Sequence, residues 1–152
     1  MVIIQNKQSI PVNEVQLKKS ALAIVAFLGY QKFDLSIQLV TNQDMQKYNK
    51  QFRSVDKPTD VLSFPFFDHI KAGQRLVPTC ADEYVLGDII MSPLYIQEHL
   101  HLWDDTFEHR LLILLVHSIC HLLGYDHIED ADFALMDAEE KRILAHLERV
   151  MQ

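Results

Sequence analysis

The stretch His117-Ser118-Ile119-Cys120-His121-Leu122-Leu123-Gly124-Tyr125-Asp126-His127 decides how the chain must fold around it. On a helix, His117 and His121 lie one turn apart on the same face. Gly124 stands where a helix would end with a left-handed residue, so the chain can turn and bring His127 back. Three neutral imidazoles on one cation leave a coordination position open, as in catalytic zinc sites. The spacing therefore predicts a metal site formed by His117, His121 and His127.

The same spacing nearly matches the zinc-peptidase signature H-E-x-x-H-x-x-G-x-x-H. Ser118 stands where those enzymes have the glutamate that acts as general base. A serine hydroxyl cannot take a proton from a metal-activated water near neutral pH. Ordinary peptide hydrolysis is therefore disfavoured, although a zinc peptidase-like hydrolase with a different base stays open as an alternative.

Composition predicts a single folded domain over residues 1–152. The chain has 152 residues, of which 49% are hydrophobic, enough for one full core. No apolar run reaches transmembrane length, and the first residues lack the basic segment of a signal peptide. We therefore expect a cytoplasmic protein that does not contact the membrane. Cys80 and Cys120 are too few for a disulfide framework, and we expect reduced thiols.

The charge of the chain is uneven, which bears on its partners. The net charge is −7, and phosphate backbones attract basic surfaces. A basic strip interrupts the acidic chain and consists of Lys47, Lys50, Arg53 and Lys57, with Asp56 the single acid between them. This strip could guide RNA or be an ordinary solvated surface. Binding of free RNA should be weak and steeply salt-dependent, so we expect a protein partner to present the substrate.

Hydrophobic periodicity, capping residues and turn residues predict alternating strands and helices. Expected strands cover residues 2–5, 35–40, 60–66 and 84–91, and expected helices cover 16–28, 43–51, a segment from Ser92-Pro93, 106–123 and 131–150. Thr41, Ser92 and Asp130 are the expected helix caps. The apolar run 111–116 predicts a buried helix that holds the first two histidines rigidly. The pattern favours an α+β fold, a small mixed sheet packed with helices, whose strand order stays open.

Three segments resemble the YbeY family of bacterial endoribonucleases, the rRNA maturation factors. The family's H-G-x-x-H-L-x-G-Y-D-H corresponds to residues 117–127, with Ser118 in place of the usual glycine. Its R-x-x-x-x-P-T-D-V-L-S-F corresponds to Arg53 followed by Pro58-Thr59-Asp60-Val61-Leu62-Ser63-Phe64. Its L-G-D-I corresponds to Leu86-Gly87-Asp88-Ile89. The three motifs appear in the family's order and are together highly specific.

The resemblance implies a metal-dependent, single-strand-specific endoribonuclease. It implies a role in maturation of the 16S rRNA 3′ end and in ribosome quality control, with the 16S rRNA precursor as substrate and the ribosome or its small subunit as partner. It also implies a zinc-like ion on His117, His121 and His127, or another divalent transition metal, with Arg53 as a further active-site residue. DNA is not an expected substrate.

The chemistry of these residues leaves several roles open. A guanidinium suits the extra negative charge that develops on a phosphodiester, so Arg53 is the best candidate for that task. Asp126, Asp60 and Asp88 are candidates for orienting a ligand or contacting substrate, and the general base is unassigned. Either an activated water or the 2′-hydroxyl of the RNA could attack phosphorus. A non-catalytic ribosome assembly factor with a structural metal is the remaining alternative.

Overall fold

A computed structural model describes residues 1–151 of the chain. Its elements in chain order are β1 (Val2–Asn6), α1 (Glu14–Phe27), β2 (Asp34–Leu39), α2 (Asn42–Arg53), β3 (Val61–Pro65), the 3₁₀ turn η1 (Ala81–Glu83), β4 (Val85–Met91), α3 (Pro93–Glu98), the 3₁₀ turn η2 (Leu100–Leu102), α4 (Phe107–Leu122) and α5 (Asp130–Val150). Every strand and helix expected from sequence is present, and most ends differ by one or two residues. The predicted α+β class is confirmed.

The four strands form one mixed sheet in the order β1-β2-β4-β3. The pairs β1–β2 and β2–β4 are parallel, whereas β3 runs antiparallel to β4 at the edge of the sheet. The parallel pairs need long crossover connections, which α1 and the segment containing α2 supply. The order that the sequence left open is therefore fixed by two crossovers and one antiparallel edge strand.

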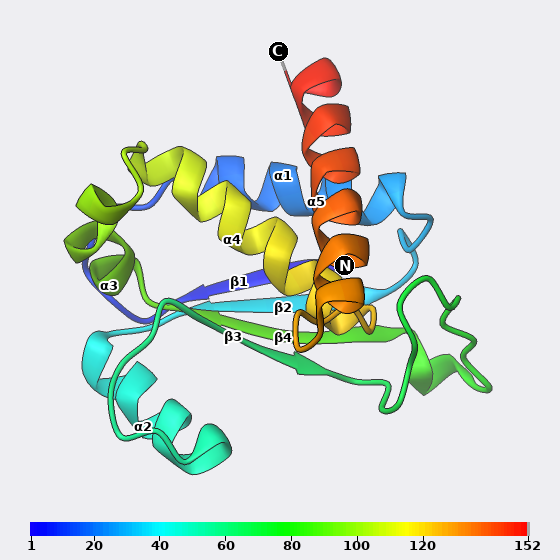
Figure 1. Cartoon of the computed structure of the whole chain (residues 1–152), viewed down its shortest axis with the longest axis horizontal. Helices are drawn as coiled ribbons and strands as arrows, with labels where there is room; N and C mark the ends of the chain where they lie inside the picture. Colours follow the sequence, from blue (N-terminus) through cyan, green and yellow to red (C-terminus); the bar gives the residue numbers. More distant parts are fainter. Residues whose placement is uncertain (152) are drawn as a thin grey trace.

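Helices cover the two faces of the sheet unequally. Figure 1 shows α1, α4 and α5 on one face and α2 on the other. Leu35, Ile37 and Leu39 alternate along β2 and belong to the large core cluster under α1, α4 and α5. A smaller cluster, which includes Met45 of α2 and Ile90 of β4, lies on the opposite face. The larger core cluster therefore holds α4, the helix that carries His117 and His121, against the sheet.

Helix α4 is held mainly by its apolar side. Thr106 accepts a hydrogen bond from the backbone N–H of His109 and caps the helix. Leu115, Val116 and Ile119 have no exposed surface, as the apolar run predicts for a helix buried in the domain. Ile113 is only half-buried, so the run is not enclosed on every side. No helix within residues 1–151 has the length and apolar character needed to span a membrane.

The three predicted helix caps have different outcomes. Thr41 caps α2 by accepting from the N–H of Asp44. Ser92 precedes α3, but its hydroxyl donates to the Oδ1 atom of Asn42 and makes no cap hydrogen bond. Asp130 is the first residue of α5 and not its cap, because the helix begins one residue earlier than expected. Ser92 therefore occupies the predicted N-cap position without a side-chain cap bond, and the prediction for Asp130 is wrong.

Candidate metal centre

Three histidine side chains converge at the C-terminal end of α4. His117 and His121 lie one turn apart on the helix, and His127 comes from the loop that follows. One ring nitrogen from each histidine lies within 4.8 Å of the other two. In residues 1–151, no other histidine, cysteine or acidic side chain joins this cluster. The arrangement can hold one metal ion.

The end of α4 explains how His127 returns to the helix. Gly124 adopts the left-handed conformation with φ of 91°, as its position predicts. Its N–H donates to the carbonyl of His121, and the N–H of Tyr125 donates to the carbonyl of Cys120. These two bonds form a Schellman motif. A side chain at Gly124 would also collide with the backbone carbonyl of Ile70, so both backbone conformation and packing favour glycine there.

Hydrogen bonds at the Nδ1 atoms fix the orientation of the helical histidines. The Nδ1 atom of His117 lies 3.2 Å from the Oε2 atom of Glu140 in α5. The Nδ1 atom of His121 lies 3.0 Å from the carbonyl oxygen of Tyr125. Both partners are acceptors, so in the neutral form of each ring the single proton lies on Nδ1. The lone pair of each ring is then left on Nε2, the nitrogen that would bind a metal.

The two Nε2 atoms face each other across a short gap. They lie 3.1 Å apart, and their lone pairs would repel unless a cation or a proton lies between them. A tetrahedral zinc ion with bonds of about 2.0–2.1 Å separates its nitrogen ligands by about 3.3–3.4 Å. The observed gap is close to this value. The two helical histidines therefore fit a tetrahedral transition metal, and a ring nitrogen of His127 lies within 4.8 Å of both as a third ligand.

Burial keeps His121 ready to act as a ligand. Burial, and next to it the charge of His117, lowers the pKa of His121 to about 4. The ring is therefore neutral at physiological pH, the form that binds a metal. Cys120 is fully buried among core residues, where burial raises the pKa of its thiol far above the ordinary value. It packs in the core and does not belong to the metal-binding group.

Two carboxylates of α5 support the site but are absent from the residues predicted from sequence. Glu140 is the hydrogen-bond partner of His117, and Glu139 accepts a hydrogen bond of 2.9 Å from the hydroxyl of Tyr125. Burial and this bond raise the pKa of Tyr125 to about 12. Both acids lie one turn beyond Met136, which is fully packed in the core. That spacing places them on the inward side of α5 and could have revealed them.

Comparisons with known proteins agree with this geometry. The model of the family described as "Endoribonuclease YbeY" matches residues 3–148. The human protein named "Endoribonuclease YbeY" is 38% identical over 149 residues, which cover 97% of this chain and 89% of that protein. The chain belongs to the endoribonuclease YbeY family. A relative of the same name from Caldicellulosiruptor saccharolyticus is 36% identical over 94% of each chain.

A solved structure extends the comparison to the fold. The solution structure of TM1509 from Thermotoga maritima superimposes with a TM-score of 0.63 and 28% sequence identity. The match covers 95% of this chain and 89% of that chain. The sheet and its helices are therefore the fold of a solved relative, and the resemblance read from the three family motifs is confirmed.

Two other residues of the family motifs lie away from the histidines. Arg53 is exposed and is the last residue of α2, the helix that Figure 1 shows on the opposite side of the sheet from α4. It forms no ion pair or hydrogen bond with residues 1–151, and Asp56, its closest acid in sequence, pairs with Lys50. Asp88 is exposed on β4 and points away from α4, because its neighbours Gly87 and Ile89 face the helix layer.

Asp126 and Asp60 both bind nearby backbone. The Oδ1 atom of Asp126 accepts from the N–H of Ile128 at 3.3 Å, which tightens the ligand loop. Within the described chain no hydrogen bond joins Asp126 to a histidine, and the orienting acceptors are Glu140 and the carbonyl of Tyr125. The Oδ1 atom of Asp60 accepts from the N–H of Val61 at 2.7 Å at the start of β3.

Proposed function

We propose that the chain is a metal-dependent endoribonuclease whose domain, residues 1–152, holds one zinc ion on His117, His121 and His127. The observation that carries the proposal is the pair of Nε2 atoms at 3.1 Å, each with its Nδ1 proton bound elsewhere. Family membership supplies the reaction class, because the relatives are named endoribonucleases. Another divalent transition metal with the same geometry is compatible with these ligands.

The protein's own residues would position the substrate and the ligands. A zinc ion held by His117, His121 and His127 would supply Lewis acidity, which would lower the pKa of water toward about 7 and stabilise charge on a phosphoryl oxygen. Glu140 and the carbonyl of Tyr125 keep the rings of His117 and His121 in the tautomer that binds the ion. Arg53, whose guanidinium has no partner among residues 1–151, is proposed to bind the phosphate oxygens of the RNA.

The proposed substrate is single-stranded RNA, in particular the 3′ end of the 16S rRNA precursor in the cytoplasm. The proposed partner is the ribosome or its small subunit, in keeping with a role in ribosome quality control. A net charge of −7 supports such a partner, because an acidic protein binds free RNA weakly. The basic strip on and after α2 would then make the local contact with the RNA backbone.

The test is cleavage of a labelled single-stranded RNA by purified zinc-loaded protein. We expect His117→Ala to lose bound zinc and to reduce cleavage by about 10³-fold or more. His109→Ala is the matched control, because His109 lies on the same helix but outside the cluster. The control should retain cleavage and zinc. Equal cleavage by wild type and His117→Ala would reject the proposed site.

Product analysis separates the remaining alternatives. A 2′,3′-cyclic phosphate end shows attack by the RNA 2′-hydroxyl, and its absence from the initial products shows direct attack by water. Zinc-dependent digestion of casein would favour the peptidase alternative, although Ser118, in the position of the peptidase base, is fully buried. Ribosome binding that survives while no RNA is cut would favour a non-catalytic assembly factor.

A further inference from the structure

A cavity opens beside the first half of α4, away from the histidine cluster. Its volume is about 120 Å³, and it lies between α3, η2, α4 and the start of β3. Buried Ile96 and Leu114 belong to its wall, and exposed Leu102 and Trp103 form its rim. Sites that enclose drug-sized ligands have volumes of about 300–1,000 Å³. This cavity is therefore large enough for one small group only.

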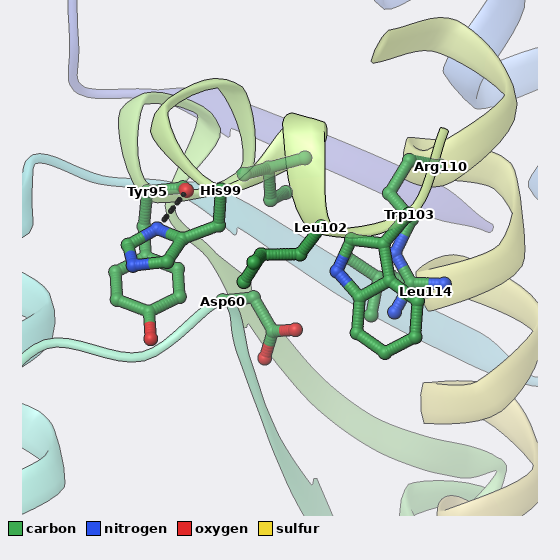
Figure 2. Close-up of a pocket in the computed structure, with 8 residues that line it drawn as sticks. Asp60, Tyr95, His99, Leu102, Trp103, Arg110 and Leu114 are labelled. Carbon is green, nitrogen blue, oxygen red and sulfur yellow. Dashed lines mark hydrogen bonds between the residues drawn. The ribbon is translucent and has the colours of Figure 1, made fainter. Parts of the chain in front are cut away.

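The cavity contains groups of opposite charge that do not pair with each other. Figure 2 shows the carboxylate of Asp60 between the Tyr95–His99 pair and Trp103. The guanidinium of Arg110 lies 3.9 Å from the centre of the Trp103 ring. Arg110 forms no ion pair in the described part of the chain, so its N–H groups are free to bind an anion. An aromatic surface, a carboxylate and a free guanidinium together suit a nucleotide.

One oxygen of the Asp60 carboxylate is free to accept a hydrogen bond. The Oδ1 atom is already bound to the N–H of Val61 and the hydroxyl of Thr59. No group within residues 1–151 donates to Oδ2. A carboxylate accepts hydrogen bonds and cannot donate them, so the group opposite must be a donor.

Guanine is the base whose chemistry matches this acceptor best. Its Watson–Crick edge carries two adjacent donors, the N1–H and the N2 amino group. Adenine and cytosine each place a ring nitrogen acceptor beside their amino group, and uracil flanks its one N–H with two carbonyls. When these bases present that edge, an acceptor faces the carboxylate beside the one donor, so guanine alone offers two donors there. A cationic side chain from a protein would instead meet the like charge of Arg110 in the same cavity.

The cavity lies in line with the histidines on α4. Arg110, Leu114, His117 and His121 follow one another at spacings of four, three and four residues, so they share one face of the helix. Arg110 and His117 are seven residues apart, a separation of about 10 Å along the helix axis. An extended RNA strand on this face would place a base in the cavity on the order of one or two nucleotides from the histidines.

We propose that this cavity is a base-binding subsite that takes a guanine of single-stranded RNA close to the cleaved phosphate. The Asp60 carboxylate would select the base, Trp103 would stack on it, and Arg110 would bind its phosphate. The subsite deepens the proposed endoribonuclease function and rests on it for its place in the reaction. Binding of a free nucleotide is independent of cleavage and can be measured separately.

Trp103 is the single tryptophan of the chain, so its fluorescence reports on the cavity directly. Zinc-loaded protein is titrated with GMP, AMP, CMP and UMP, with a free tryptophan derivative to correct for absorption by the nucleotides. We expect GMP to bind about tenfold more tightly than the other three, the effect of one well-placed hydrogen-bonded pair. Equal responses to all four nucleotides, or none, would overturn the proposal. A response to trilysine without one to GMP would show a protein-docking site and overturn it as well.

Asp60→Asn is the decisive variant. The amide keeps an oxygen for the N–H of Val61 but turns the free acceptor into a donor, so the preference for GMP should be lost. Asp104→Asn is the matched control, because it removes the same charge from the residue beside Trp103 without touching the cavity lining. Asparagine also tolerates the positive φ of 47° at this position. If the two variants behave alike, Asp60 does not select the base.

Arg110→Gln tests the phosphate contact. It also provides an independent test of the subsite if Asp60→Asn does not fold. We expect this variant to weaken GMP binding about tenfold and to leave binding of guanosine, which lacks the phosphate, unchanged. Equal weakening of both ligands would contradict the phosphate role.

Cleavage experiments keep the two proposals distinct. RNAs with one guanine moved stepwise through an adenosine tract should be cut at a fixed distance from the guanine, and Asp60→Asn should remove that dependence. Cleavage without any dependence on guanine would refute the proposed subsite but not the proposed endoribonuclease activity. Selective GMP binding by a protein that cuts no RNA would refute the proposed endoribonuclease activity but not the base-binding subsite.

Discussion

The two faces of α4 differ in what they contribute to the molecule. One face consists of apolar side chains that are almost or fully buried against the sheet and α1, among them Leu111, Leu115 and Ile119. The other face carries Arg110, half-buried like the histidines that follow it, and ends at the candidate metal centre. Stability depends mainly on the first face and the proposed chemistry on the second. Substitutions on α4 should therefore separate stability from function.

The buried face should give the largest effect on stability. Leu115 has no exposed surface, and Leu115→Ala should lower the free energy of unfolding by about 3 kcal/mol through lost burial and a residual cavity. The three histidines are unchanged, so the folded fraction should still bind one zinc ion per chain. Denaturant unfolding and metal analysis together check both statements. A loss of less than about 1 kcal/mol would show that the core collapses around the smaller side chain.

On the histidine-bearing face, loss of a supporting hydrogen bond should weaken zinc binding and leave stability nearly unchanged. Glu140→Gln takes the charged acceptor from the Nδ1 atom of His117 and should weaken zinc affinity by about 10–100-fold. Unfolding of the metal-free protein should change little, because Glu140 is only partly buried. Competition with a chelator of known affinity measures the effect. Glu148→Gln, on the exposed side of the same helix, is the matched control and should bind zinc like the wild type.

The histidine cluster could be predicted because its three members lie within eleven consecutive residues of the sequence. His117 and His121 share a helix face by spacing alone, and Gly124 marks the helix end at which the chain turns back. The antiparallel edge strand and the order of the sheet depend instead on which strands meet after long connections, and sequence spacing does not specify that. The family motifs supplied the missing information, because members of one family share one fold.

Contacts between distant segments explain what the sequence did not reveal. Glu140 is 23 residues from His117, and only the packing of α5 against α4 brings them together. Asp126 seemed suited to orient a histidine because it adjoins His127, yet its short side chain binds the backbone of its own turn. The cavity at Asp60 combines residues from β3, α3, η2 and α4, so it has no linear signature.

Acidification should destabilise the metal-free protein through the histidine face. Burial, together with the charge of His117, lowers the pKa of His121 from about 6.5 to about 4 in the folded state. Between these values the unfolded chain binds a proton that the folded chain does not. The stability that His121 contributes is therefore present above pH 6.5 and is lost as the pH falls toward 4.

Thermal unfolding across this pH range, after removal of metal, checks the effect. His121→Gln should flatten the pH dependence, whereas His101→Gln, at an exposed position outside the cluster, should retain the wild-type slope. Identical slopes for wild type and His121→Gln would show that other groups control the acid transition.

The smallest expected effect on stability is at Ser118, between the buried face and the histidine-bearing face of α4. Ser118 adjoins His117 but is fully buried, and its hydroxyl has no hydrogen-bond partner among the described residues. Ser118→Ala removes this unpaired group and improves helix propensity, so it should raise the free energy of unfolding by about 1 kcal/mol. Ser118→Gly, the residue usual in the family, also removes the hydroxyl but adds backbone freedom that offsets the gain. Zinc affinity should be the same in all three proteins, because the hydroxyl lies on the core side of α4. A change in zinc affinity with Ser118→Ala would show that the buried and histidine-bearing faces are coupled through the backbone at His117.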